Sequence, residues 1–283
     1  MALTPNTRRI LLAAYILAAT AVFFYFGFPS EALRTHAAYR LSASLPGLSI
    51  SVAGLQPSLP AGLTLRGVRI AYADQPLAVL DRLRVQPELT SIFQPRTVYS
   101  FEGSAGSGSI SGRAEIDSSE IKPKTNLNAR IGGVLLQQVP GFQNIYGSRL
   151  SGRLEGSFSV NEEGVLAGKL TMAEAQLDLA TPVFAQKSFT FRTADADITF
   201  QNRTLLLRNG RLKGNEMDAE VAGSIVLGPS PGAGTLSLNG RLTPHPAFLA
   251  RVEGGLPANL LRRRATIPFR VTGPLDAPGF ALN

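Results

Sequence analysis

The sequence predicts a mainly β protein, in which an N-terminal transmembrane helix precedes a curled, mostly antiparallel sheet with a few short helices. Three observations predict this class. Apolar and polar residues alternate through most of the chain after residue 48, as they do in strands with one dry and one wet face. The 283 residues include 28 Gly and 19 Pro, which suit many turns between strands. Residues 10–28 carry no charge and are numerous enough to cross a bilayer as a helix.

The N-terminal segment is predicted to be a retained anchor. As a helix, residues 10–28 would be about 28 Å long, close to the ~30 Å hydrocarbon core of a bilayer. Arg8 and Arg9 directly precede this run, and basic flanks stay in the cytoplasm. Residues 1–9 are therefore predicted to be cytoplasmic, and everything after the anchor to lie outside the inner membrane. The alternative is a cleaved signal peptide ending near Ser30-Glu31-Ala32, although its apolar region is usually only about 7–15 residues long.

Residues 29–47 are predicted to form a short membrane-proximal helix. Ser30 is suited to cap its start, and apolar residues then recur every four positions until the chain reaches Pro46-Gly47. The spacing is compatible with a helix that docks on the following domain and with one that lies at the membrane surface. The recurring apolar residues are Leu33, Ala37, Leu41 and Leu45.

Residues 48–283 are predicted to form one β-rich periplasmic domain, because no low-complexity linker divides them. Gly67 interrupts the alternation and predicts a bulge. Asn161 to Gly164 read as a hairpin turn, and short helical pieces are expected at 132–146 and 246–253. Strands are expected at 48–53, 63–72, 78–86, 97–102, 109–116, 125–131, 149–160, 165–172, 189–192, 197–200, 204–212, 217–227, 235–242 and 267–272.

The alternation divides each strand into an apolar and a polar side. In the hairpin at 149–172, for example, Leu154 lies on the apolar side and Glu155 on the polar side. A sheet with one apolar face must cover that face, and two short helices are too few to cover so many strands. The sheet therefore closes as a sandwich or barrel, or it curls into a trough suited to an acyl chain. The residues expected on this core or trough lining are Leu150, Leu154, Phe158, Phe189, Phe191, Ile198, Phe200, Leu236 and Leu238.

The sequence shows no pattern of residues that indicates catalysis. It has no Cys and two His, His36 and His245, neither of which is placed near an acid or nucleophile at the spacing of a triad or metal site. Asp195 and Asp197 share one side of a strand, as solvated carboxylates do. The formal charge of +8 is scattered, which favours solubility over nucleic-acid binding. We therefore expect no enzyme activity, no cofactor, no metal and no nucleic-acid partner.

A short phrase, Ser-Gly-Arg or Asn-Gly-Arg, recurs without a fixed period. It occurs at 111–113, 151–153, 209–211 and 239–241. Because the offsets between the copies differ, the phrase indicates a repeated solution to building a strand and not a solenoid repeat.

Several stretches carry a family resemblance. The N-terminal anchor is followed by GLTLRGVRIAYADQPLAVLDRLRVQP at 62–87, SRLSGRLEGSFSV at 148–160 and IPFRVTGPLDAPGFALN at 267–283. This arrangement resembles the N protein of the bacterial type II secretion system, GspN. It is also similar to the broader AsmA-like group, whose membrane-anchored, β-rich members form curled sheets with an apolar trough and are linked to lipid traffic.

The resemblance implies a single-pass protein of the bacterial inner membrane, with its C-terminal domain in the periplasm. It implies an accessory or assembly role in type II secretion, with other envelope proteins of that system as partners. The AsmA-like alternative is a module that binds or transfers lipid by shielding phospholipid acyl chains in its trough. The resemblance supplies no catalytic residue.

Overall fold

The computed structural model describes residues 48–59, 61–72, 75–91, 94–117, 124–143, 147–183, 186–228, 233–246, 248 and 266–282. The predicted anchor, with Arg8 and Arg9, and the predicted helix at 29–47 lie outside these residues. Most of the helix predicted at 246–253 lies outside them too. Within the described part of the chain, no helix combines the length and the apolar character needed to cross a membrane.

The described residues form one antiparallel sheet of 14 strands, which confirms the prediction of a mainly β, antiparallel chain. Each strand pairs with the next one along the sequence, from β1 to β14. The strands are β1 (Leu48–Ser58), β2 (Gly62–Tyr72), β3 (Gln75–Pro87), β4 (Arg96–Ala105), β5 (Gly108–Asp117), β6 (Lys124–Leu135), β7 (Arg149–Val160), β8 (Leu166–Val183), β9 (Gln186–Gln201), β10 (Thr204–Gly214), β11 (Met217–Val226), β12 (Thr235–Pro244), β13 (Ile267–Pro274) and β14 (Gly279–Leu282).

The segment at 132–146 is only partly helical. Its first residues extend β6, because Val134 pairs with Leu154 of β7 beyond an irregularity in the register. Among residues 132–143, helix is confined to one 3-10 turn, η1 (Leu136–Gln138), and one short helix, α3 (Pro140–Gln143). The predicted hairpin turn is present, and the Asn161 side-chain oxygen accepts hydrogen bonds from the backbone N–H groups of Glu163 (3.1 Å) and Val165 (2.9 Å).

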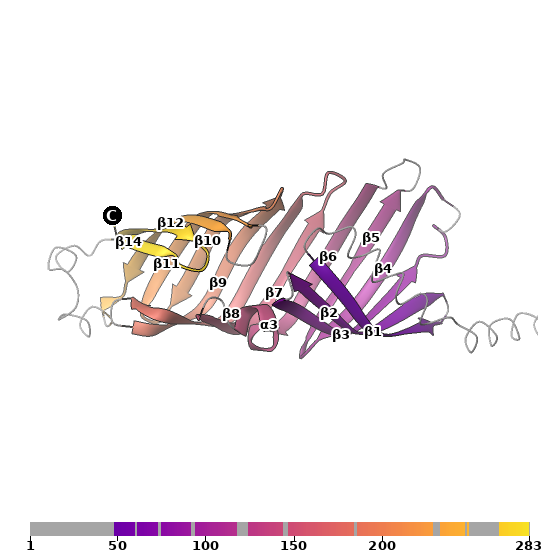
Figure 1. Cartoon of the computed structure of the whole chain (residues 1–283), viewed down its shortest axis with the longest axis horizontal. Helices are drawn as coiled ribbons and strands as arrows, with labels where there is room; N and C mark the ends of the chain where they lie inside the picture. Colours follow the sequence, from indigo (N-terminus) through magenta and orange to yellow (C-terminus); the bar gives the residue numbers. More distant parts are fainter. Residues whose placement is uncertain are drawn as a thin grey trace, which may run out of the picture.

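The sheet is strongly curled. Tyr72, at the end of β2, donates a hydrogen bond of 2.6 Å from its hydroxyl to the carbonyl oxygen of Gly228, which follows β11. In a flat sheet these two strands would lie nine steps apart, or about 43 Å. Figure 1 shows β1–β3 running across one end of the long row of strands, and β11–β14 folded back at the other end. The hydrogen bond therefore joins two parts of the sheet across its curl.

Local irregularities accompany the curl. Gly133 (φ 65°) and Asn209 (φ 50°) have left-handed backbones and lie at breaks in the register of β6 with β7 and of β10 with its two neighbours. Such bulges bend the strand and increase its twist. Gly67 also has a positive φ of 58°, and the alternation changes there as expected. The pairing of β2 with β1 and with β3 keeps one register on both sides of Gly67, so no extra residue is inserted and the predicted bulge is wrong.

The recurring Ser/Asn-Gly-Arg phrase has a packing explanation. A Cβ atom at Gly112 would lie 2.6 Å from the ring of Phe101 on the paired strand, and one at Gly210 would lie 2.7 Å from the side chain of Val221. A Cβ at Gly240 would collide with the ring of Phe269. At these three of the four copies, the glycine thus leaves room for an apolar side chain of the neighbouring strand.

Two clusters of buried residues lie at different places on the apolar face. The first cluster, on β1 and β2, contains Val52, Leu55, Leu65 and Val68. The second, which we call the Phe248 cluster, joins β8, β9 and β11 to the residue after which it is named. Its buried members are Ala175, Phe189, Phe191, Met217 and Phe248.

Candidate functional site

The apolar face of the sheet carries one continuous row of residues that runs across all 14 strands. The strand register places one residue of each strand directly opposite the next, and every member is apolar, glycine or proline. We call this set the apolar row. From β1 to β14 its members are Pro57, Leu63, Val85, Phe101, Gly112, Ala129, Phe158, Gly168, Ile198, Leu207, Gly223, Leu238, Val271 and Phe280.

The row follows from the alternation of the sequence combined with the register. Thirteen steps between neighbouring strands correspond to about 62 Å along the curled sheet. Phe158 and Ile198 lie on either side of Gly168, and a Cβ at that glycine would be 3.2 Å from Phe158 and 3.3 Å from Ile198. Large side chains therefore lie beside small residues along the row. Its surface is apolar throughout, and it is depressed at the glycines because they have no side chain.

The apolar side chains lie on the more sheltered side of the curl. Along β7, Leu154, Phe158 and Val160 are half-buried, whereas the alternating residues Glu155 and Ser157 are exposed. In β4–β7 few apolar residues reach full burial; these include Ala129 and Val134. The apolar face is thus covered at the two clusters and only partly covered between them.

The residues predicted for the apolar face fall into two groups. Phe189 and Phe191 are buried, at 7% and 8% exposure, in the Phe248 cluster. Three others, Phe158, Ile198 and Leu238, belong to the apolar row. All except Phe189 and Phe191 are half-buried, and they are Leu150, Leu154, Phe158, Ile198, Phe200, Leu236 and Leu238.

The sequence did not single out Phe101, Ala129 or Leu207 as members of the row. Each of them follows the alternation, but only the register shows that they face Gly112, Phe158 and Ile198. Alternation along one strand identifies a face, and it does not identify which residue of the next strand lies opposite.

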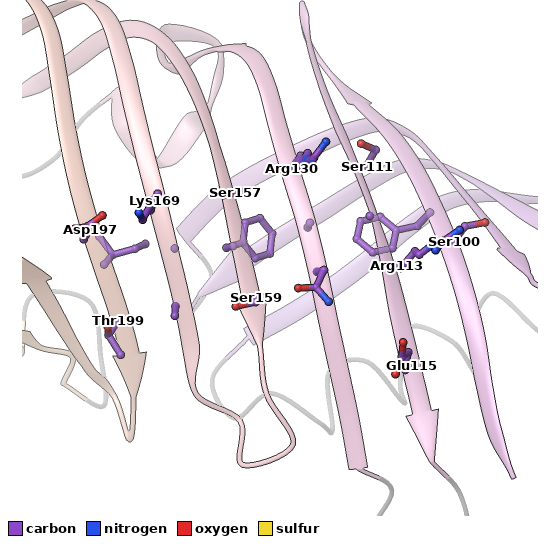
Figure 2. A pocket seen from close by; sticks show the side chains of 18 of the residues that line it. Ser100, Ser111, Arg113, Glu115, Arg130, Ser157, Ser159, Lys169, Asp197 and Thr199 are labelled. Carbon is purple, nitrogen blue, oxygen red and sulfur yellow. The ribbon is translucent and has the colours of Figure 1, made fainter.

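A groove of about 1290 Å³ crosses β4–β10, and its lining combines six residues of the apolar row with the polar residues next to them in the sequence. Figure 2 shows that its labelled side chains come from β4 to β9, and they include Ser157, Lys169 and Asp197. Its charged lining comprises four cations, Arg113, Arg130, Lys169 and Arg208, and three acids, Glu102, Glu115 and Asp197. The opposite charges nearly balance, so the groove offers little net charge to a ligand, and the apolar row forms part of its surface.

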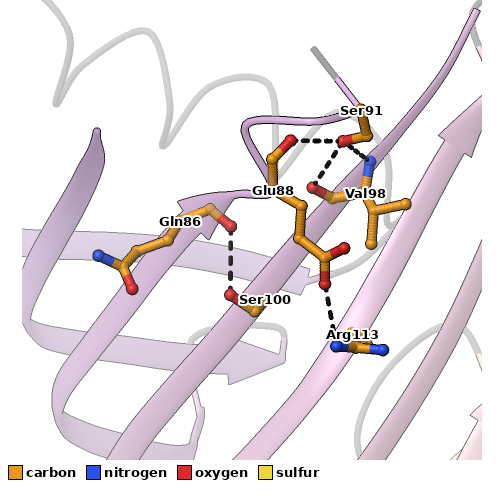
Figure 3. A network of polar contacts seen from close by, with 6 residues as sticks. All are labelled: Gln86, Glu88, Ser91, Val98, Ser100 and Arg113. Carbon is orange, nitrogen blue, oxygen red and sulfur yellow. Dashed lines mark hydrogen bonds and ion pairs between the residues drawn. The ribbon is translucent and has the colours of Figure 1, made fainter. Parts of the chain in front are cut away.

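A polar network fixes the connection between β3 and β4 beside this groove. The buried hydroxyl of Ser91 donates to the carbonyl oxygen of Glu88 (2.8 Å) and accepts from the backbone N–H of Val98 (2.9 Å). The Glu88 carboxylate forms an ion pair of 3.1 Å with Arg113 of β5, as Figure 3 shows. The Arg113 side chain is 71% exposed, so the pair contributes little stability. The network holds the loop in place and brings together no catalytic groups.

The described residues contain no group of three or more His, Cys, Asp or Glu side chains that is suited to hold a metal ion. Asp195 and Asp197 lie on the polar side of β9. Asp195 accepts a hydrogen bond from Thr171 (2.9 Å), and Asp197 accepts one from Asn209 (2.9 Å). The glycine-rich stretch at 103–112 forms the β4–β5 hairpin.

Comparison of the chain with protein families, with curated proteins and with solved structures gives no match. The arrangement of residues on the sheet is therefore the basis on which a function is proposed.

Proposed function

We propose that this protein is a non-enzymatic, membrane-anchored component whose curled sheet forms an AsmA-like trough that shields the acyl chains of lipids in the periplasm. The observation that carries the proposal is the apolar row, which is uninterrupted by a polar side chain across 14 strands. If the row served only as a hydrophobic core, other parts of the chain would be expected to cover it, because burial of an apolar sheet face stabilises the fold.

The partial burial of the row supports the same proposal. Phe158, Ile198 and Leu207 are half-buried, so part of each side chain still contacts solvent when no ligand is bound. An acyl chain on this surface would remove the remaining apolar area from water, which is worth roughly 25 cal/mol per Å². The trough needs no polar group to bind a hydrocarbon, which accords with a row made only of apolar residues, glycine and proline.

The test is the lipid that remains with the full chain after purification in detergent, measured by mass spectrometry. Phe158→Asp puts a charge in the row, and Ser157→Asp puts the same charge on the adjacent residue of the opposite face. We expect Phe158→Asp to lower retained phospholipid about tenfold, which corresponds to about 1.4 kcal/mol of binding free energy. We expect Ser157→Asp to retain as much as the parent. Absence of lipid from the parent, or equal retention in both variants, would overturn the proposal.

A second candidate is an assembly role in the type II secretion system, as the resemblance to GspN implies. The three resembling stretches correspond to β2–β3, β7 and β13–β14. β14 pairs only with β13 among the described strands, and Phe280 and Leu282 of β14 are 41% and 36% exposed. An edge of this kind is suited to pair with a strand of another envelope protein.

Deletion of the gene in its host tests the second candidate through the amount of secreted protein in the medium. Loss of secretion that is restored by the parent chain and not by Leu282→Lys would support pairing at the β14 edge. Unchanged secretion in the deletion strain would exclude the assembly role and leave the lipid proposal intact.

A further inference from the structure

His245 lies where the chain leaves β12, and both nitrogens of its ring have partners. Nδ1 is 3.1 Å from the carbonyl oxygen of Asn215, and Nε2 is 3.3 Å from a carboxylate oxygen of Asp218. A carbonyl oxygen and an ionised carboxylate accept hydrogen bonds and donate none. Both contacts are therefore complete hydrogen bonds only when both ring nitrogens carry a proton, that is, in the imidazolium form.

The same residue begins a turn that carries the most deeply buried aromatic ring among the described residues. The backbone N–H of His245 donates to the carbonyl oxygen of Glu216 (2.8 Å), and the N–H of Phe248 donates to the carbonyl oxygen of His245 (3.0 Å). Phe248 is 1% exposed and packs with Phe191 and Met217. The turn thus places this ring on the apolar face of β8–β11, where it covers part of the trough.

We propose that the protonated side chain of His245 fastens this turn, so that Phe248 covers the apolar face of β8–β11 most firmly at low pH and the turn opens more often as the pH rises. The device regulates how much of the trough is open, and in that respect it rests on the proposed function. The fastening itself is a property of the chain and is measurable without lipid.

The charges around His245 agree with this direction. Hydrogen bonds to Asn215 and Asp218 raise the pKa of His245 above its ordinary value of 6.5, while partial burial and Arg192 of β9 oppose the rise. Glu216 contacts His245 through its backbone carbonyl. A raised pKa means that the contribution of His245 to the fastened state is complete below pH 6.5 and is lost as the pH rises through the pKa of the folded protein.

The composition of the chain makes the test direct. The sequence has no Trp and two His, so Phe248→Trp introduces the sole indole and His36→Gln leaves His245 as the sole imidazole. In the full chain in detergent, we expect acrylamide to quench the emission of Phe248→Trp less near pH 5 than at about pH 8. The midpoint should coincide with the titration of His245 observed by NMR. His245→Gln should abolish the pH dependence, and Asp218→Asn should lower the midpoint.

Hydrogen exchange of the Phe248 amide in the parent chain provides a second measurement in case the indole does not fit. After correction for the intrinsic effect of pH, exchange should accelerate up to about tenfold for each unit by which the pKa of His245 is raised. A pH dependence that persists in His245→Gln, or a constant corrected exchange rate in the parent, would overturn the proposal. Both readouts are independent of lipid retention, so failure of the fastening and failure of lipid binding are distinguishable.

Discussion

The Phe248 cluster and the open stretch of the apolar row on β4–β7 are built from the same kinds of residues on the same face. They differ in what covers them. Phe191 packs in the Phe248 cluster and is 8% exposed, whereas Phe158 lies outside both buried clusters and is half-buried. Alternation thus prescribes an apolar face, while the packing over that face decides whether a side chain stabilises the fold or remains available to a ligand.

The sharpest test of this comparison removes the same side chain from both regions. Phe191→Ala should lower the free energy of unfolding by about 3–5 kcal/mol, because it leaves a cavity in a packed cluster. Phe158→Ala should cost only roughly 1–2 kcal/mol, because that ring is half-buried and contributes less buried apolar area. Urea unfolding of the full chain in detergent measures both values. Equal losses would mean that the open stretch is packed as tightly as the cluster.

The next test contrasts the two faces of β7 within the open stretch. Leu154 pairs with Val134 and Met172, so a charge from Leu154→Glu should destabilise the chain by about 2 kcal/mol or more. Glu155→Lys on the exposed face should cost less than about 1 kcal/mol. The unfolding midpoints of the two variants give the answer. If both changes are mild, β7 is not half-buried and the division into two faces is wrong.

A third test examines how tightly neighbouring strands pack within the row. Gly112→Ala should cost about 1–3 kcal/mol, because the added methyl group would meet the ring of Phe101 and the backbone of β6. Gly54→Ala on β1 is the matched control, since its nearest neighbour would be Arg66 Cβ at 3.9 Å, an ordinary contact. The control should change stability by no more than about 0.5 kcal/mol. Thermal unfolding of the two variants compares them.

The smallest expected effect concerns a charge outside the apolar face. The side-chain amide of Gln176 donates to Asp178 (3.0 Å) and, together with Ser188 and Arg149, holds the pKa of Asp178 below its ordinary value of 3.8. Asp178 therefore adds a little stability above pH 3.8, which is lost as the pH falls through the lowered pKa. Asp178→Asn should change stability by under about 0.5 kcal/mol at neutral pH. Unfolding midpoints of the parent chain and of Asp178→Asn, measured over a series of pH values, check this prediction. A difference in stability well above about 0.5 kcal/mol at neutral pH would contradict it.

Much of the fold could be predicted from the sequence because alternation is a local property. The strand predicted at 149–160 and the turn after it agree with β7 and its hairpin. The strand predicted at 165–172 is part of the 18-residue β8, and the two strands predicted at 189–192 and 197–200 form the single 16-residue β9. Their bulges shift the alternation, as at Glu174, whose φ is 53°, and a shift of this kind looks like the end of a strand. β14 has only four residues and follows a proline, so its pattern is too short to read.

The candidate site was predictable only in part. Alternation placed Phe158 and Ile198 on an apolar face, but nothing along the chain shows that Gly168 lies between them. The partners of His245 were equally invisible, because Asn215 and Asp218 lie on a different hairpin 27 to 30 residues earlier in the sequence.

By itself the sequence determined the strands, their two faces and the absence of cysteine chemistry, because each depends on residue type and on a period of two. The tertiary structure alone decided the strand register, the curl of the sheet and the packing of Phe248 over part of the apolar face. Register is set between strands, and it aligns 14 separate residues into one apolar row. The curl brings Tyr72 to Gly228 across nine strand steps, and the turn at His245 places Phe248 on one part of the face. These are contacts between residues distant in sequence, and no local pattern encodes them.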